Sequence, residues 1–234
     1  MRCFINISAW LDEEEKNPHK QKALENASRY FNEKDELNVN LLEAIYAQES
    51  SFGKYRRKRN MNGAAGDFQL ERQTAKRYGL IVSKNNDQRF DVDNASEAAA
   101  KYLKNLDVIF SKESILTSKI KTISISDTIE RKKIVIAANN GGEGLIAIAQ
   151  AEALRAGKNP KLWSDLKEFL VKAGASESKS NEIIEYVNKI LQYEKMFQKE
   201  SKAEKSDKFK EPLKNSILKN ADKWITKDGK HIHI

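Results

Sequence analysis

Apolar residues recur at the three- and four-residue spacing of helices over two long stretches, residues 21–110 and 127–200. Three of the predicted helices carry clear signals. One is capped by Asn94, one starts near Pro160, and one has an apolar stripe over residues 183–191. Only three prolines and ten glycines interrupt the 234 residues, which argues against a β-rich fold. The pattern therefore predicts a mainly α protein.

Composition divides the chain into three regions. Residues 1–20 form a polar, charged lead-in, residues 21–200 the helical domain, and residues 201–234 a basic, Lys-rich extension. Within the domain, residues 111–126 are rich in Ser, Thr, Lys and Ile, which predicts a long connector with one strand of β-branched residues. No stretch reaches the roughly 18–20 apolar residues of a membrane helix.

We expect no signal peptide, because no small-residue cleavage site follows the short apolar stretch near the N-terminus. Delivery by a phage, export by a dedicated secretion machine and a missing upstream segment all stay open. Cys3 is the only cysteine, so neither an internal disulfide nor a cysteine-based zinc site can form. His231 and His233 lack a third metal ligand nearby, and no metal site is predicted.

The net charge of +8 is compatible with nucleic acid, anionic lipid or an anionic wall polymer, and equally with solubility alone. The densest basic cluster is made of Lys54, Arg56, Arg57, Lys58 and Arg59. Apart from Tyr55 it lacks the interleaved aromatic residues of a single-strand stacking surface. This composition argues against nucleic acid as the partner.

One acidic residue falls where the helical pattern calls for an apolar one. Glu49 lies in the middle of the apolar face of the helix predicted over residues 38–50, whereas Glu43 falls on the opposite face, as a surface acid should. Removal from water raises the pKa of a carboxyl. A protonated carboxyl in an apolar cleft can donate to the leaving oxygen of a glycoside. A Glu in a last helical turn can also simply bend out to water.

Two glycine-containing segments bring further polar groups. Residues 63–70 combine small residues with Gln69, whose amide could bind a sugar, and glycine lets the backbone approach a ligand closely. Residues 139–144 hold three glycines and two asparagines, which is typical of a turn with exposed polar groups. Either segment alone would also fit a plain connector between helices.

Taken with Glu49, these segments resemble the lytic transglycosylases, the murein-cleaving enzymes similar to goose-type lysozyme. The first block consists of residues 49–50, 63–70 and 74–75. It is similar to the Glu-Ser, Gly-Ala-x-Gly-x-x-Gln and Thr-Ala pattern of that family. Four such blocks stand in the family's order over about residues 25–195.

The other three blocks follow along the chain. Residues 89–103 resemble the next helix, especially in the membrane-bound type D enzymes. Residues 137–144 resemble the Ala-Tyr-Asn-x-Gly-x-Gly loop, and residues 182–187 have the spacing of the Glu-Thr-x-x-Tyr-Val motif. Four blocks in order are a much stronger signal than any one of them.

The resemblance implies a lysozyme-like helical fold and cleavage of the β-1,4 bond between N-acetylmuramic acid and N-acetylglucosamine in peptidoglycan. By this resemblance Glu49 would protonate the leaving oxygen. It would then accept the proton of the C6 hydroxyl, which attacks the anomeric carbon and leaves a 1,6-anhydro end. The family needs no metal, no cofactor and no second catalytic carboxylate. The matching cleft positions are Ser50, Gly66, Phe68, Gln69, Asn139, Asn140 and Tyr186.

The resemblance also implies that Tyr186 hydrogen-bonds Glu49 and that Glu182 supports the fold. The sequence departs from the family at Asn139, which replaces a tyrosine, and at Asp67-Phe68, which replaces an apolar pair. Two rival functions stay open: hydrolysis on the same scaffold, and an inactive glycan-binding or structural part of a virion or secretion machine. The lack of an obvious second carboxylate for water activation favours transglycosylation. We also expect the basic cluster over residues 54–59 to meet anionic wall polymer.

Overall fold

The computed structural model describes residues 17–32, 34–56 and 63–199. The chain divides into two compact units at Glu194. All the labelled helices and strands belong to the first unit. Of the predicted lead-in, residues 1–16 lie outside the described residues, as does the whole of the predicted basic extension over residues 201–234.

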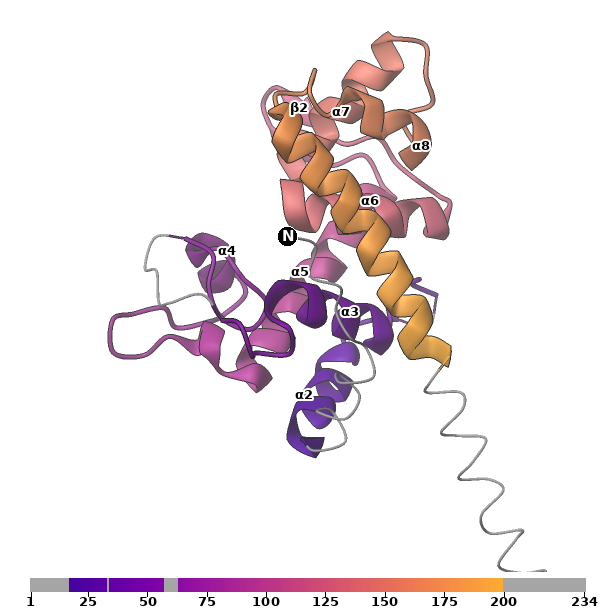
Figure 1. The fold of residues 1–234 in the computed structure, drawn as a ribbon. Coiled ribbons are helices and arrows are strands. Elements are labelled where there is room, and N and C mark those ends of the chain that lie inside the picture. Colours follow the sequence, from indigo (N-terminus) through magenta and orange to yellow (C-terminus); the bar gives the residue numbers. More distant parts are fainter. Residues whose placement is uncertain (1–16, 33, 57–62, 200–234) are drawn as a thin grey trace, which may run out of the picture. The chain divides into compact units, whose positions relative to one another are not determined.

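The protein is mainly helical, as the periodicity predicts (Figure 1). The helices are α2 (Pro18–Ser28), α3 (Val39–Ser50), α4 (Arg72–Arg77), α5 (Val92–Ser111), α6 (Thr128–Gly141), α7 (Glu143–Arg155), α8 (Trp163–Leu166) and an unlabelled last helix over residues 177–199. Short 3-10 turns, Gln88–Phe90 and Lys167–Phe169, precede α5 and follow α8. None of the described helices is both long and apolar enough to cross a membrane.

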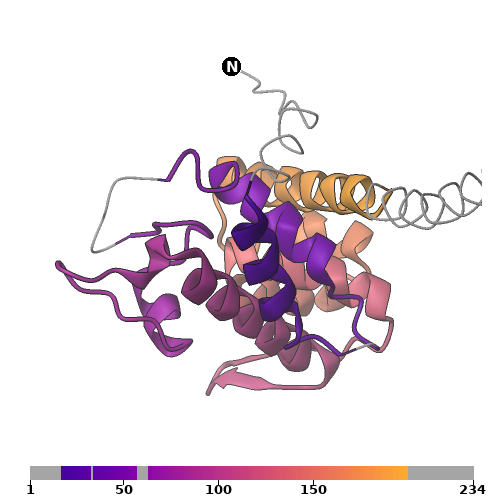
Figure 2. The same cartoon turned by 90° about the horizontal axis from the view of Figure 1, so that it is seen from below.

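Other helices pack on α5, which is the longest labelled helix. Both α2 and α6 lie along it, and α7 packs against α6 (Figures 1 and 2). Its buried side chains include Leu103, Leu106 and Phe110. The predicted cap was wrong: Asp91 caps α5 by accepting a hydrogen bond from the Asn94 backbone N–H, so the helix begins earlier than the sequence suggested.

The connector after α5 forms a short hairpin, and Figure 2 shows it at the edge of the helices. Strands β1 (Ile115–Thr117) and β2 (Ile120–Lys121) pair antiparallel, where the sequence predicted one strand. Thr122 is buried behind β2, with Oγ1 3.0 Å from the carbonyl oxygen of Ile109 in α5. The Gln150 side chain of α7 exchanges two hydrogen bonds with the backbone of Ile123. The connector is therefore fixed to both helices.

Helix α3 carries Glu49 and is buried on more than its apolar face. Asn38 caps it by accepting from the Leu41 N–H at 2.9 Å. Glu43 is only 8% exposed, so the prediction of a surface acid was wrong, because both α2 and α5 pack on this helix. Ser51 and Phe52, with φ of 48° and 56°, turn the chain into the left-handed region directly after the helix. This turn ends α3 just past Glu49.

A buried ion pair organises the segment between α3 and α5. Arg89 is 0% exposed; Nε donates to Asp87 Oδ1 at 2.9 Å and Nη2 to Oδ2 at 2.8 Å. Its Nη1 donates to the carbonyl oxygens of Gly63 at 2.6 Å and Leu70 at 3.1 Å. Gly63 and Leu70 bound the segment from residue 63 to residue 70, which we call the 63–70 loop. One guanidinium therefore holds both ends of this loop.

Replacing Arg89 by Ala should lower the free energy of unfolding by about 3–5 kcal/mol, because Asp87 is left buried without its partner. Urea unfolding of the wild type and the variant measures this difference. The matched control is Lys121→Ala, which removes an exposed partner of Glu113 and should change stability by less than about 1 kcal/mol. A loss at Arg89 as small as that of the control would contradict the structural role given to this pair.

Candidate active site

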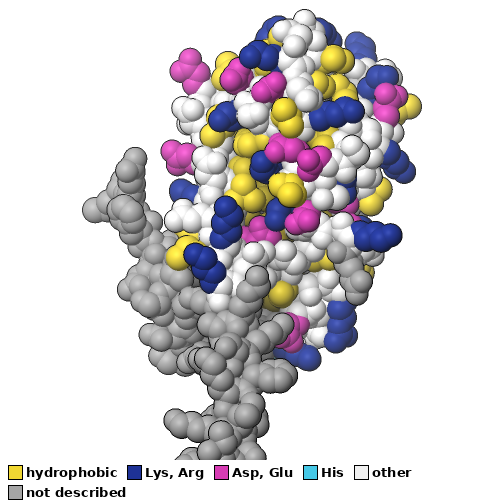
Figure 3. Space-filling view, turned by 90° about the vertical axis from the view of Figure 1, so that its right-hand side faces the viewer, with side chains coloured by type: hydrophobic (Ala, Val, Ile, Leu, Met, Phe, Trp, Pro, Cys, Tyr) yellow, Lys and Arg dark blue, Asp and Glu magenta, His cyan; other side chains and the backbone are white. Residues whose placement is uncertain are grey.

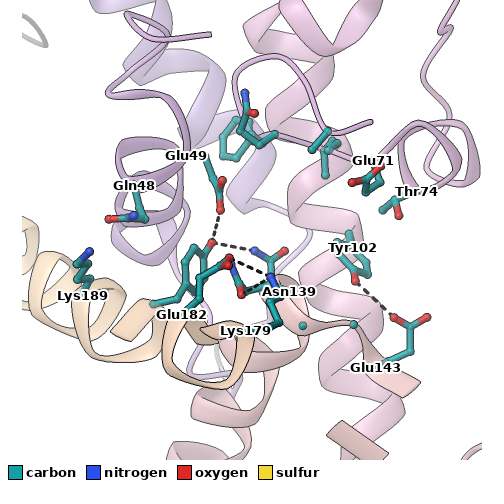
Figure 4. Close-up of a pocket in the computed structure, with 18 of the residues that line it drawn as sticks. Gln48, Glu49, Glu71, Thr74, Tyr102, Asn139, Glu143, Lys179, Glu182 and Lys189 are labelled. Carbon is teal, nitrogen blue, oxygen red and sulfur yellow. Dashed lines mark hydrogen bonds and ion pairs between the residues drawn. The ribbon is translucent and has the colours of Figure 1, made fainter. Parts of the chain in front are cut away.

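A cleft of about 660 Å³ opens beside the end of α3 (Figure 4). Its wall is built from the last turn of α3, the 63–70 loop with the start of α4, the junction of α6 and α7, and the last helix. Glu49, Phe68, Gln69, Asn139, Asn140 and Tyr186 all line this cleft. Six of the predicted site residues, distant in sequence, are therefore brought together.

Glu49 is held by a hydrogen bond from across the cleft. The Tyr186 hydroxyl donates to Glu49 Oε1 at 2.6 Å, and Asn139 Nδ2 donates to the Tyr186 oxygen at 3.0 Å (Figure 4). Tyr186 is 5% exposed. Burial, and then the Glu49 charge, raise the pKa of this hydroxyl well above its usual value, so it stays a proton donor. The predicted contact between Tyr186 and Glu49 is confirmed.

Phe68 and Gln69 belong to the part of the cleft wall that the 63–70 loop forms. The Phe68 ring stacks on Tyr46 of α3 with centroids 5.1 Å apart. Gln69 has a left-handed backbone with φ of 45°, a conformation that costs energy for a residue other than glycine. Its Nε2 donates to the Gly66 carbonyl at 2.7 Å, while among the described residues its buried Oε1 has no hydrogen-bond partner. Such an acceptor suits an N–H or hydroxyl of a ligand.

Two predicted cleft residues lie behind the wall instead. Ser50 is 2% exposed; its Oγ donates to the Asp67 carbonyl at 2.7 Å and accepts from the Gly53 N–H at 2.9 Å. At Gly66, an added Cβ would come within 1.8 Å of the Arg89 carbonyl oxygen. Neither lines the cleft. We correct both from substrate contacts to supports: Ser50 fastens the loop to α3, and Gly66 permits the close approach to Arg89.

The opposite rim carries a charged network. Lys179 Nζ donates to Glu182 Oε1 at 2.9 Å and to Asn140 Oδ1 at 3.1 Å, and Asn140 Nδ2 donates to Glu182 Oε1 at 3.2 Å. This network links α6 to the last helix. Glu182, expected only to support the fold, lines the cleft. Lys179 could not be recognised from the sequence, because one of its partners, Asn140, is 39 residues away and the other, Glu182, is an ordinary i+3 neighbour.

Glu49 is not the only carboxylate of the cleft. Glu71, Glu143, Glu182 and Glu185 line it as well. Glu143 lies 3.5 Å from Arg77 and accepts from the Tyr102 hydroxyl at 3.4 Å, while Glu185 lies 3.8 Å from Lys189. The expectation of no obvious second carboxylate was therefore wrong, and it no longer separates transglycosylation from hydrolysis.

The basic cluster is in part an internal support. Arg56 Nε donates to Asp67 Oδ1 at 2.7 Å, and Asp67 is fully buried. The residues over 57–59 lie outside the described part of the chain. On the face drawn in Figure 3, positive and negative side chains are interspersed, so that face presents no field of a single sign. Contact with anionic wall polymer through Lys54 and its neighbours stays a prediction.

Within the described ranges there is no group of three or more His, Cys, Asp or Glu side chains that could hold a metal ion. His231 and His233 lie outside those ranges.

Burial raises the pKa of Asp67 above its usual value, although the neighbouring Arg56 acts in the opposite direction. A carboxyl with a raised pKa binds its proton more tightly in the folded protein. The free energy of unfolding therefore falls as the pH rises from the unfolded pKa, about 3.9, towards the folded pKa, and is constant above it. Relative to Asp67→Asn, the wild type should lose stability across that window in urea unfolding at stepped pH. A difference that grows in favour of the wild type as the pH rises would contradict this assignment.

Comparison with protein-family models adds evidence independent of the geometry. Residues 26–161 match the model described as Transglycosylase SLT domain, and this region includes Glu49, Gln69 and Asn139. No curated protein matches the chain. Because the family match spans more than half of the 234 residues, the chain belongs to the Transglycosylase SLT domain family, the lytic transglycosylases that act on peptidoglycan.

Proposed function

We propose that this protein cleaves the β-1,4 bond between N-acetylmuramic acid and N-acetylglucosamine, with Glu49 as general acid and then general base, and leaves a 1,6-anhydro end. The observation that carries the proposal is the position of Glu49. Its carboxyl lines the cleft in a half-buried place and receives a 2.6 Å hydrogen bond from the buried Tyr186. A carboxyl fixed in this way can transfer a proton without first having to be oriented.

In the first step, protonated Glu49 gives its proton to the glycosidic oxygen as the bond to the anomeric carbon breaks. The resulting carboxylate is stabilised by the hydrogen bond from Tyr186, since hydrogen bonding to the charged form favours it. In the second step, the carboxylate takes the proton of the C6 hydroxyl while that oxygen bonds to the anomeric carbon. Glu49 ends protonated, so no net proton is consumed.

We assign the binding of the sugars to the two walls beside Glu49. Gln69 would accept a hydrogen bond from an N-acetyl N–H or a hydroxyl, since its buried Oε1 has no partner among the described residues. Phe68 would give an apolar surface beside it, as sugar-binding clefts often combine apolar walls with a few polar groups. Asn140 would contact the sugar from the opposite rim, where it is held by Lys179.

Hydrolysis is the second candidate, because four further carboxylates line the cleft. A carboxylate that activates a water would deliver that water to the anomeric carbon in place of the C6 hydroxyl. The two reactions differ by one water in the product. Mass spectrometry of the soluble fragments distinguishes them directly.

Glu49→Gln should lower the release of soluble muropeptides from isolated sacculi by at least about 100-fold, because the amide cannot donate the proton. The products of the wild type should carry anhydro ends, as measured by mass spectrometry. Glu113→Gln is the matched control, since it makes the same change on the exposed connector and should retain activity.

Three results would contradict parts of the proposal. Activity that survives Glu49→Gln would remove the catalytic role of this residue. Products that are heavier by one water would show that the protein catalyses hydrolysis with the same acid, and not transglycosylation. Binding to sacculi without any soluble product from the wild type would indicate a glycan-binding or structural protein.

A further inference from the structure

The hydroxyl of Tyr186 has two hydrogen-bond neighbours in the described part of the chain. It donates to Glu49 Oε1 at 2.6 Å and accepts from Asn139 Nδ2 at 3.0 Å. Glu49 comes from α3, Tyr186 from the last helix and Asn139 from α6, and the two hydrogen bonds join them in a row; dashed lines mark these bonds at the labelled Glu49 and Asn139 in Figure 4. Asn139 lies where the resemblance would place a tyrosine, so this row is a property of this chain.

We infer that Asn139 is a positioning residue: it directs the single proton of the Tyr186 hydroxyl towards Glu49 and so places the transferable proton of Glu49 on Oε2. The inference rests on the proposed function for its catalytic meaning, but not for its geometry. It assigns Asn139 a task other than contact with the cleaved sugar.

The number of hydrogens that each of the three groups can donate determines how they are arranged. A phenol hydroxyl carries one hydrogen, and an amide nitrogen offers only donors. Because Nδ2 of Asn139 occupies an acceptor site on the Tyr186 oxygen, the one hydroxyl hydrogen is free to point to Glu49 Oε1. In a protonated carboxyl the carbonyl oxygen is a stronger hydrogen-bond acceptor than the hydroxyl oxygen, so the oxygen that accepts from Tyr186 is best assigned as the carbonyl one. The acidic proton is therefore assigned to Oε2.

Without a donor at residue 139, the opposite arrangement becomes available. Glu49 could then hold its proton on Oε1 and donate it to the Tyr186 oxygen, while the tyrosine hydrogen turns to another acceptor. In that state the acidic proton is bound inside the protein rather than offered to the glycosidic oxygen. Asn139 thus selects the productive one of two arrangements that have the same number of hydrogen bonds.

The other ionisable groups around the cleft are present in every variant of the test. Among the residues that the structure describes, they are Glu182, Glu185, Lys179 and Lys189 on the last helix, Tyr102 on α5, Glu143 on α7 and Glu71 before α4. Since the substitutions leave them unchanged, a difference between variants reports on the row of Asn139, Tyr186 and Glu49.

The decisive variant is Asn139→Asp, which has nearly the same shape but offers only acceptors when ionised. The Tyr186 hydrogen should turn to the new carboxylate. Glu49 then loses a donor to its charged form and gains a like charge, and both changes raise its pKa. Carbon-detected NMR titration of the Glu49 carboxyl should show a midpoint at least about one pH unit higher than in the wild type. The kcat on sacculi should fall roughly 10- to 100-fold, the scale of one hydrogen bond to a charged group.

Two controls separate positioning from added charge and from sugar contact. Asn140→Asp adds the same charge one residue away. The new carboxylate keeps the hydrogen bond from Lys179 and loses the one to Glu182, and it has no contact with Tyr186, so the Glu49 midpoint should move less than half as far. In a Tyr186→Phe background, Asn139→Asp should shift the Glu49 midpoint far less than in the wild type, because the hydroxyl that connects residue 139 to Glu49 is already absent. Circular dichroism on each variant confirms that it is folded.

Equal midpoint shifts in the wild-type and Tyr186→Phe backgrounds, or a change in KM alone, would overturn the inference. The NMR titration needs no turnover. If the wild type releases no product, the proposed function fails while the titration still decides the role of Asn139.

Discussion

A fully buried guanidinium needs hydrogen-bond partners for its N–H groups, and this requirement determines how the wall of the cleft is built. Arg89 meets the carboxylate of Asp87 through two bonds and two backbone carbonyls through a third nitrogen. Leaving either charge alone would be costly. The 63–70 loop is held at both ends by these bonds, and Gly66 lies so close to the Arg89 backbone that no side chain fits between them.

The constraint reaches Glu49 through a short series of contacts. The Asp67 N–H donates to the Arg89 carbonyl, and the Asp67 carbonyl accepts from Ser50, the residue after Glu49. From the other side, Tyr186 fixes the carboxyl itself. The backbone and the side chain of Glu49 are thus held by different parts of the fold. In the proposed reaction, preorganisation of this kind spares the cost of orienting the Glu49 carboxyl at the moment of proton transfer.

The helical pattern was enough to predict the mainly α fold, and Glu49 stood out because its type conflicted with its position. What periodicity could not reveal depends on contacts between distant segments. Glu43 is only 8% exposed, although the helical pattern alone places it on the solvent face, and α2 and α5 both pack on its helix. Glu71 and Glu143 line the same cleft, although they are 72 residues apart in the sequence. Motif matching identified Ser50 and Gly66 as site positions, but only the packing shows that they support the wall.

The bond between Tyr186 and Glu49 joins residues 137 positions apart. A growing polypeptide that has not yet reached residue 186 has its acid but lacks the partner that orients it. The hydrogen bond that orients the Glu49 carboxyl therefore forms only after the helix over residues 177–199 has been synthesised and has packed beside α3 and α6.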